Sequence, residues 1–248
     1  DGVCGVQFCN LTSINGAKVK TKQDFIEASK AAAIIGTLQA AYTDFKYLSN
    51  AAKKLTDDEA LLGVSITGMM DNPAVLLDAG CQNLASVAAV EANRVWAEKI
   101  GIKQAARVTC IKPEGTSSLV LESASGIHPH HSRKYFRRVQ MNKIDNVYQF
   151  FKMYNEHMCE PSVWSANKTD DVVSFPIEVG PEAIVKGDLS AKQHLEYIKS
   201  TQTNWVIPGT NDYDKPIHHN VSCTVSVKDD EWDFVTKYLF DNRQYFCA

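Results

Sequence analysis

The chain has 248 residues, of which 44% are hydrophobic and 22% are charged, so it can bury a substantial core and is not a disordered segment. A formal net charge of -3 excludes the broad basic field with which proteins wrap nucleic acid. Seven cysteines without a CxxC pair indicate a reducing compartment, and neither a membrane-spanning apolar run nor a signal-peptide pattern is present. We therefore expect a cytoplasmic protein with neither nucleic acid nor a membrane as partner.

The first half of the chain is dominated by two long helical patterns. Thr21 as N-cap, with Asp24 three residues later, predicts a mostly buried helix that extends to about Leu48. A short strand is expected between the glycines at 63–68, and a second long helix over 75–100, ended by the following glycine.

The second half alternates shorter elements. In order, the pattern predicts a buried strand at 107–111, a turn at 112–115 with a helix starting at Thr116, a strand at 135–141, a helix at 147–158, a strand at 172–179, a helix at 190–205, a strand at 221–227 and a helix at 229–240. Pro176 favours an edge position or an irregular end for its strand. This alternation indicates an α/β fold with largely parallel strands, in which ligands meet the C-terminal strand ends.

No linker, repeat or low-complexity tract divides the chain, so we expect one domain over 1–248. The chain begins at Asp1 rather than at Met, and it stops within an amphipathic pattern at Ala248. We therefore expect it to be a piece of something longer.

The turn from Lys112 to Ser118 is the clearest candidate for a binding site. Gly115 and three hydroxyl residues stand at an expected helix start, where free backbone N–H groups favour an anion such as a phosphate. Simple capping by Thr116 or Ser117 explains the spacing equally well, and the turn is not a Walker loop. Glu114 counts against an anion.

The histidines and cysteines are ambiguous by themselves. His128, His130 and His131 form the densest imidazole cluster, and a zinc hydrolase is one interpretation, but no Cys or carboxylate stands at metal-ligand spacing, so we expect no metal site. The pair at 218–219 precedes an expected strand, where it could meet substrate or lie on the surface. Cysteines in such apolar runs are more typical of a core than of catalysis, Cys9 included. We likewise expect a structural rather than a catalytic role for Cys81, Cys110, Cys159, Cys223 and Cys247.

Along nearly its whole length, from about Val3 to Phe246, the chain resembles class II, adenosylcobalamin-dependent ribonucleotide reductases. Six blocks match in order and spacing: 8–15, 31–45, 62–68, 112–119, 125–128 and 220–226. The resemblance implies a ten-stranded α/β barrel of two antiparallel halves, with helices outside the strands and a central finger loop bearing a thiyl-radical cysteine. This chain would supply mainly the second half, the C-terminal part of the catalytic barrel.

The resemblance also implies roles for individual residues. Cys9 matches the second member of the cysteine pair that reduces the ribose 2'-position. The segment that holds substrate phosphates is matched by Pro113, Glu114, Gly115, Thr116, Ser117 and Ser118. The family's substrates are ribonucleoside di- or triphosphates, its cofactor is adenosylcobalamin, and a thioredoxin-type protein restores the cysteine pair.

The chain departs from the family in three places. These are the Asn-Pro-Cys-x-Glu segment with the radical cysteine, the first redox cysteine together with the N-terminal region that bears the allosteric nucleotide site, and the C-terminal shuttle pair, for which Cys247 should not be mistaken; all are missing here. We therefore expect the chain to be inactive alone and to need a complementary N-terminal reductase segment. The alternative is a non-catalytic nucleotide-binding or regulatory module derived from the same barrel.

Overall fold

The computed structural model describes residues 5–211 and 217–246, which divide into two compact units. The main unit consists of Asp1–His130 and Glu182–Ala248, and the inserted unit is His131–Pro181. No composition change marks the boundaries of the inserted unit. The expected single domain over 1–248 therefore stays a prediction about the whole chain.

A parallel sheet forms the centre of the main unit. Strand β1 (Asn10–Asn15) pairs with β2 (Leu62–Thr67) in parallel, with Leu11 opposite Gly63. Segment 107–111 continues the sheet on the other side of β2, since the Val64 N–H donates to the Val108 carbonyl at 2.8 Å. Next to it, Ile111 and Val221 form a parallel bridge.

The two expected strands at 107–111 and 221–227 are thus only partly present. Segment 107–111 bonds to both neighbours but forms isolated bridges rather than a continuous ladder. In the second segment, pairing stops after Val221, because the Thr224 N–H donates to the His128 imidazole instead of a neighbouring strand. The expectation of a strand through residue 227 was wrong for this reason.

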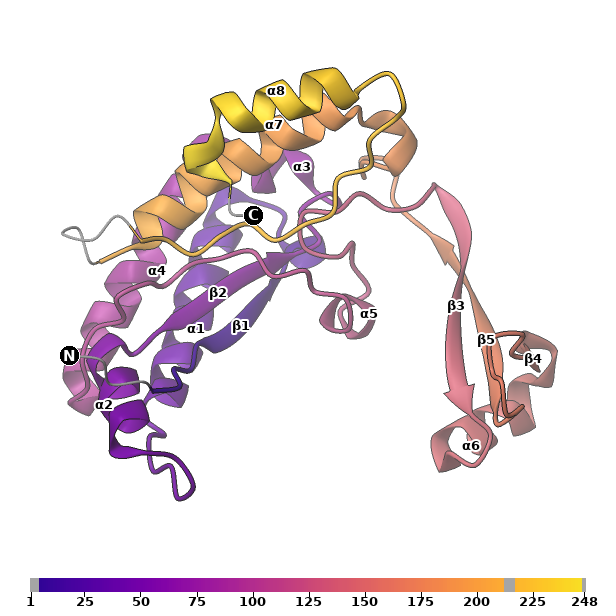
Figure 1. Cartoon of the computed structure of the whole chain (residues 1–248), viewed down its shortest axis with the longest axis horizontal. Helices are drawn as coiled ribbons and strands as arrows, with labels where there is room; N and C mark the ends of the chain where they lie inside the picture. The colour runs from indigo at the N-terminus through magenta and orange to yellow at the C-terminus, as the bar shows by residue number, and fades with distance from the viewer. Residues whose placement is uncertain (1–4, 212–216, 247–248) are drawn as a thin grey trace. The chain divides into compact units, whose positions relative to one another are not determined.

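The helices of the main unit lie between these strands in the chain, except α8, which follows the last of them. They are α1 (Lys22–Ala40), α2 (Asn50–Glu59), α3 (Pro73–Leu76), α4 (Ala79–Ile100), α5 (Ser117–Val120), α7 (Ala191–Thr201) and α8 (Trp232–Asp241). Short 3-10 turns are η1 (Gly16–Lys18), η3 (Lys186–Asp188), η5 (Ile207–Gly209) and η6 (Arg243–Tyr245), and η4 (Gln202–Val206) is a π-helical turn. Helices α1 and α4 run side by side, and α1 packs on β1 and β2 (Figure 1).

Helix α1 begins as predicted and ends earlier. Thr21 and Asp24 form a reciprocal capping box, with the Asp24 N–H donating to the Thr21 hydroxyl at 3.1 Å. The helix ends at Ala40 rather than near Leu48, and the Phe45 ring packs on Phe8 at 5.0 Å between ring centroids. Phe45, which the helical pattern included, therefore packs on Phe8 instead of continuing the helix.

The second long helical pattern, expected to form one helix over 75–100, forms two helices, α3 and α4. Asp78 accepts from the Cys81 N–H at 2.7 Å and starts α4, which separates it from the one-turn helix α3. Gly101, with φ of +75°, ends α4 as expected, because a left-handed residue after a helix favours glycine.

The two faces of the main sheet differ in chemistry. Toward the helices, Val64 and Ile66 are fully buried, and the Thr109 hydroxyl donates to the Trp205 carbonyl at 2.6 Å. Side chains alternate along a strand, so the opposite face carries the intervening residues. They include the small or polar residues Cys9, Ser13, Gly63, Ser65 and Cys110, together with the apolar Leu11.

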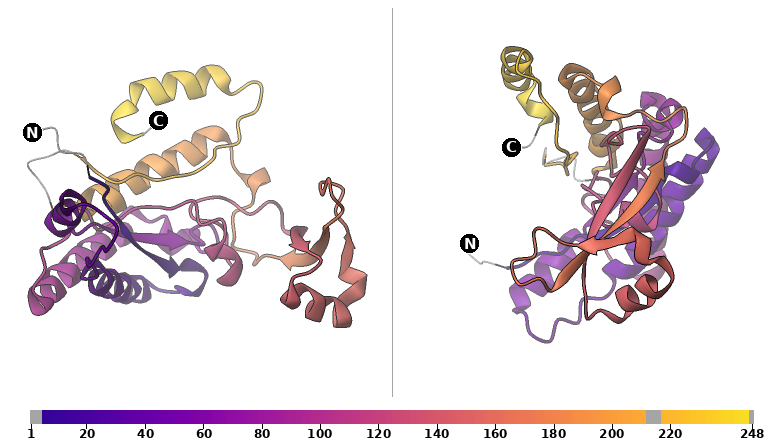
Figure 2. Two further views of the ribbon diagram at one scale, coloured as in Figure 1. Left: turned by 60° about the horizontal axis from the view of Figure 1, so that its bottom comes forward. Right: turned by 90° about the vertical axis from the view of Figure 1, so that its right-hand side faces the viewer.

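The inserted unit is a three-stranded antiparallel sheet with one helix (Figure 2). Its strands are β3 (Lys134–Asn142), β4 (Cys159–Pro161) and β5 (Asp170–Glu178), in the order β3-β5-β4, with helix α6 (Asn146–Asn155) followed by η2 (Glu156–Met158). Strand β5 is central, so the edge alternative for Pro176 was wrong; the proline lies toward the end of the strand, beyond the part that β4 pairs. The proline is tolerated because β4 pairs only with the start of β5, so Pro176 has the single partner Phe136.

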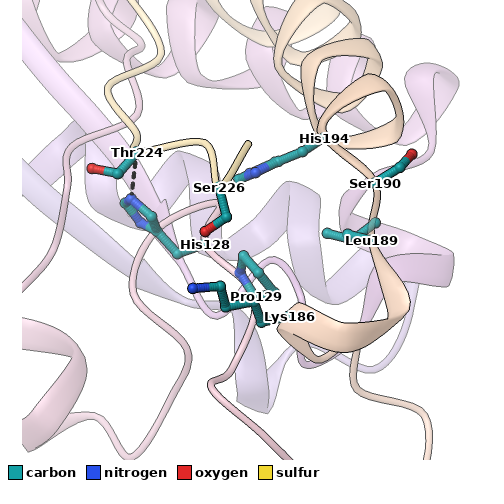
Figure 3. Close-up of a pocket in the computed structure, with 8 residues that line it drawn as sticks. All are labelled: His128, Pro129, Lys186, Leu189, Ser190, His194, Thr224 and Ser226. Carbon is teal, nitrogen blue, oxygen red and sulfur yellow. Dashed lines mark hydrogen bonds between the residues drawn. The ribbon is translucent and has the colours of Figure 1, made fainter. Parts of the chain in front are cut away.

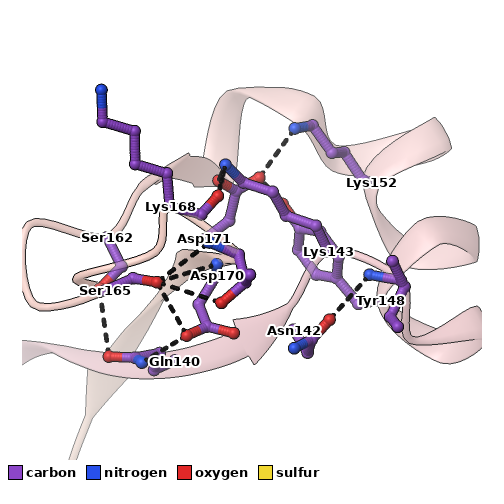
Figure 4. Close-up of polar contacts among 12 residues, drawn as sticks. Gln140, Asn142, Lys143, Tyr148, Lys152, Ser162, Ser165, Lys168, Asp170 and Asp171 are labelled. Atoms are coloured by element: carbon purple, nitrogen blue, oxygen red, sulfur yellow. Dashed lines mark hydrogen bonds and ion pairs between the residues drawn. The ribbon is translucent and has the colours of Figure 1, made fainter.

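A buried carboxylate joins α6 to this sheet (Figure 4). Asp171, 2% exposed, accepts a short hydrogen bond from the Tyr148 hydroxyl and one from the Lys152 ammonium at 2.9 Å. Burial alone would raise the pKa of Asp171, but the bonds from Tyr148 and Lys152 outweigh it and lower the pKa. The ionised carboxylate therefore stabilises the folded inserted unit.

We expect Asp171→Asn to lower the free energy of unfolding of the inserted unit by about 1–3 kcal/mol, since the amide leaves buried donors poorly paired. In the wild type this stabilisation is present at neutral pH and is lost as the pH falls through the lowered pKa of Asp171. Hydrogen exchange of the β5 amides at several pH values measures both effects. Glu160→Gln, which removes an exposed pair with Arg138, is the control, and equal effects of the two variants would contradict the assignment.

Among the described residues, no helix is long and apolar enough to cross a membrane.

Candidate functional site

The turn after segment 107–111 is held tightly against β2. The Lys112 N–H donates to the Ser65 hydroxyl at 2.8 Å, and the Ser125 hydroxyl donates to the Pro113 carbonyl. A Cβ at Gly126 would lie 2.6 Å from the Lys112 carbonyl oxygen, and Gly126 has φ of +55°. Only glycine fits this crossing without strain. The turn is therefore preformed by its neighbours.

Glu114 points into the protein rather than toward a ligand. Its carboxylate accepts from the Ser13 hydroxyl at 2.8 and 3.1 Å and from the Ser117 hydroxyl, and the Lys112 ammonium lies 3.5 Å away. Its side chain is fully buried, and its backbone has φ of +51°. The negative charge that counted against an anion is thus compensated internally. Of Glu114, only the backbone remains to contact a phosphate.

The rest of the turn faces outward. Gly115 and Thr116 are exposed, Ser117 is half-buried and Ser118 is buried. Thr116 makes no side-chain cap to α5, and the Ser117 hydroxyl is directed to Glu114, so capping does not account for these hydroxyl residues. Within the described part of the chain, the backbone N–H groups of residues 115–117 donate to no acceptor. They are available to an anionic oxygen.

The predicted redox residue Cys9 is half-buried directly before β1. Burial raises the pKa of its thiol to about 11, against the opposing charges of Arg107 and Lys112. Its Sγ lies 3.9 Å from Nε2 of His219. At neutral pH the thiol of Cys9 is therefore protonated rather than a free thiolate.

A second thiol lies close to Cys9. A Cβ at Gly63 would be 3.1 Å from the Sγ of Cys9 and 3.2 Å from the Sγ of Cys110, so the missing side chain makes room for both sulfurs. Burial, and then the neighbouring Cys9, raise the pKa of Cys110 to about 12. The sequence assigned Cys110 to the core, which is where it lies; its proximity to Cys9 was not predicted.

Strand β1 connects Cys9 to the turn. Ser13 follows Cys9 by four residues on the same face of the strand, roughly 13 Å further along at the usual rise per residue. From there its hydroxyl donates to Glu114. Both predicted parts of the site thus belong to one sheet face, and Ser13 is a link that no sequence motif indicated.

The histidine cluster does not converge. His128 accepts from the Thr224 N–H at 2.8 Å and donates from Nδ1 to the Ser125 carbonyl at 2.7 Å, so it is a neutral structural bridge. His130 bonds instead to Asp71 at 2.6 Å, and His131 lies edge-on to Tyr135. In residues 5–211 and 217–246, no three His, Cys, Asp or Glu side chains are placed to hold a metal ion. The zinc hydrolase interpretation has no geometric support here.

A small cavity lies beside His128 (Figure 3). It holds about 180 Å³ and is lined by residues that include His194, Lys186 and Ser226. His194 is buried, which lowers its pKa, and its Nε2 bonds to the Ile127 carbonyl at 3.1 Å. Ligand sites usually hold roughly 300–1,000 Å³, so this cavity is too small for a nucleotide.

Known proteins resemble this chain in sequence over more than half its length. An adenosylcobalamin-dependent ribonucleoside-triphosphate reductase of Levilactobacillus brevis is 24% identical over 160 residues, 63% of this chain and 20% of the relative. A protein of Dictyostelium discoideum, named a probable reductase of the same kind, is 27% identical over 155 residues, 62% of this chain and 19% of the relative. No protein-family model matches the chain.

A solved structure shares the fold. The crystal structure of a B12-dependent (class II) ribonucleotide reductase superposes with a TM-score of 0.71 at 19% identity, covering 96% of this chain and 35% of that one. The chain spans about a fifth of the length of the curated relatives that it matches.

Proposed function

We propose that this chain, whose curated homologues are adenosylcobalamin-dependent ribonucleoside-triphosphate reductases, is the C-terminal part of the catalytic barrel of such an enzyme. The complete enzyme converts ribonucleoside di- or triphosphates to 2'-deoxyribonucleotides in the cytoplasm. A complementary N-terminal segment supplies the radical cysteine, and a thioredoxin-type protein supplies the reducing equivalents.

The observation that carries this proposal is the link from Cys9 through Ser13 and Glu114 to the turn. A reductase needs a dithiol at the ribose and an anion site for the phosphates of the same nucleotide. Here a half-buried thiol and a turn with available N–H groups belong to one sheet face and are joined by a hydrogen bond. The parallel segments, with α1 and α4 packed together beside them, support the second half of a ten-stranded barrel.

In this proposal each part has a defined task. Backbone N–H groups at 115–117 and the Thr116 hydroxyl hold the phosphates, while the Ser117 hydroxyl, whose proton is donated to Glu114, keeps the turn in place. Cys9 and the first redox cysteine of the complementary segment reduce the 2'-position: the two thiols supply two electrons and two hydrogens, the 2'-hydroxyl leaves as water, and a disulfide remains. The external dithiol then restores both thiols by exchange.

The described residues do not fit adenosylcobalamin by themselves. Their best-formed cavities hold about 180 to 700 Å³, and the 700 Å³ cavity is an open groove along β1 and α1. Drug-sized ligands need roughly 300–1,000 Å³, and a corrin ring with its nucleotide arm is larger than these. We therefore assign cofactor binding to the complete enzyme and derive no step through the cofactor.

The test is complementation. With adenosylcobalamin, a dithiol and ribonucleotide, we expect no deoxynucleotide from the chain alone and turnover after mixing with a segment that carries the Asn-Pro-Cys-x-Glu sequence. The control replaces the cysteine of that segment with serine. Turnover by the isolated chain would contradict the proposal, and nucleotide binding without turnover in the mixture would favour the alternative of a regulatory module.

A further inference from the structure

His128 joins two segments of the main unit that are far apart in the sequence. Its Nδ1 donates to the Ser125 carbonyl at 2.7 Å, and its Nε2 accepts the Thr224 N–H at 2.8 Å (Figure 3). A carbonyl only accepts a hydrogen bond and a backbone N–H only donates one, so the two bonds require the neutral ring with its proton on Nδ1. Each ring nitrogen therefore has one fixed partner.

The Ser125 end of this link reaches the turn at 112–118. The Ser125 hydroxyl donates to the Pro113 carbonyl, and Gly126 crosses the turn so closely that a Cβ would lie 2.6 Å from a backbone oxygen. The Ser125 carbonyl accepts from the backbone N–H of His128, at 2.8 Å, and from its imidazole. Ser125 is thus held by His128 on one side and holds the turn on the other.

The Thr224 end of the link holds the segment that leaves the sheet. The last backbone bond to the neighbouring Ile111 comes from the Ser222 N–H, which donates to its carbonyl at 2.9 Å. In the described part of the chain, the bond from Thr224 is the one hydrogen bond that holds residues 223–227. The ring of His128 therefore sets this segment and the turn relative to each other.

We propose that His128 is a positioning residue for the turn: it holds Ser125 where the Ser125 hydroxyl keeps the Pro113 carbonyl, and with it the N–H groups of residues 115–117, in place for a phosphate. The ring acts through Ser125 rather than on the ligand. That the ligand is the phosphate chain of a ribonucleotide rests on the proposed function. The positioning itself does not, because its hydrogen bonds join residues of this chain.

Two amide side chains separate the two bonds of the ring. In His128→Asn, the amide nitrogen takes the place of Nδ1 and keeps a donor toward Ser125, but it leaves Thr224 without an acceptor. In His128→Gln, the longer side chain brings an amide oxygen to the place of Nε2, which keeps the acceptor for Thr224 without the donor to Ser125. His131→Ala is the control, because this histidine of the same cluster is exposed and its ring lies against Tyr135.

The first measurement is amide hydrogen exchange in the purified chain. The Ser118 N–H donates to the Glu114 carbonyl at 3.1 Å within the turn, so its exchange reports how firmly the turn is held. We expect His128→Ala to speed exchange at both Ser118 and Thr224. His128→Asn restores slow exchange at Ser118 alone, His128→Gln restores it at Thr224 alone, and His131→Ala changes neither.

The second measurement is the binding of inorganic tripolyphosphate to the same variants, followed by NMR. We expect His128→Ala and His128→Gln to weaken binding about two- to tenfold, the range for the loss of one hydrogen bond, and His128→Asn to bind as the wild type does. In the complemented enzyme, the KM for ribonucleotide should rise by the same factor in the same two variants, with kcat little changed.

Unchanged exchange at Ser118 in a folded His128→Ala variant would overturn the proposal. If that variant does not fold, the two amide variants decide, because each keeps one bond, and equal exchange at Ser118 in both would also overturn it. A wild type that shows the expected exchange pattern but binds no tripolyphosphate would remove the phosphate role of the turn, and with it the proposed function. His128 would then still be shown to position the turn, so the two failures are distinguishable.

Discussion

In the reconstituted enzyme, Cys9→Ser should reduce dithiol-dependent deoxynucleotide formation to background, a loss on the order of a thousandfold or more, as for other essential groups. Serine keeps the size of the side chain and a hydrogen-bonding atom beside His219, but it cannot form a disulfide or supply electrons. The measurement is deoxynucleotide formed per enzyme in the complemented mixture. Binding of the two segments should be unaffected.

Cys81→Ser is the matched control for this experiment. Cys81 is half-buried in the first turn of α4, where its N–H bonds to Asp78, and its pKa is raised by burial and by Asp78. It takes no part in the proposed site, so its substitution should leave turnover unchanged. Full activity of Cys9→Ser would remove Cys9 from the redox pair and favour a regulatory module.

The second large effect is expected at the turn. Replacing both Thr116 and Ser117 with alanine should raise the KM for ribonucleotide about tenfold to a hundredfold, because the Thr116 hydroxyl loses one hydrogen bond to a charged group, which contributes roughly 1.5–3 kcal/mol. The value of kcat should change less, since phosphate binding is common to substrate and transition state. Steady-state kinetics of the complemented enzyme separates the two parameters.

The two single substitutions, Thr116→Ala and Ser117→Ala, should raise the KM for different reasons. Thr116 is exposed, so Thr116→Ala removes a hydroxyl that faces outward, whereas Ser117→Ala also removes a donor to Glu114 and is expected to loosen the turn. Thr203→Ala is the control, because that exposed hydroxyl bonds only within its own helical turn, to the Lys199 carbonyl. A KM unchanged in the double variant would exclude these side chains from phosphate binding.

Local elements could be predicted from the sequence because a few neighbouring residues determine them. The capping box of Thr21 and Asp24 and the end of α4 at Gly101 both depend on contacts within a few residues. The errors arose where distant residues compete for the same groups. Phe45 packs on Phe8 instead of extending α1, and the Thr224 N–H donates to His128 instead of to a neighbouring strand.

By itself, the sequence determined the α/β character of the chain, the turn, Cys9 as the candidate thiol and the resemblance to class II reductases. Only the tertiary structure decided how these parts act together: that Glu114 turns inward to Ser13, that Gly63 makes room for two thiols, and that His219 lies beside Cys9. Cys9 and His219 are 210 positions apart in the sequence. Side chains so distant meet only through the tertiary fold, and no local pattern records which pairs will touch.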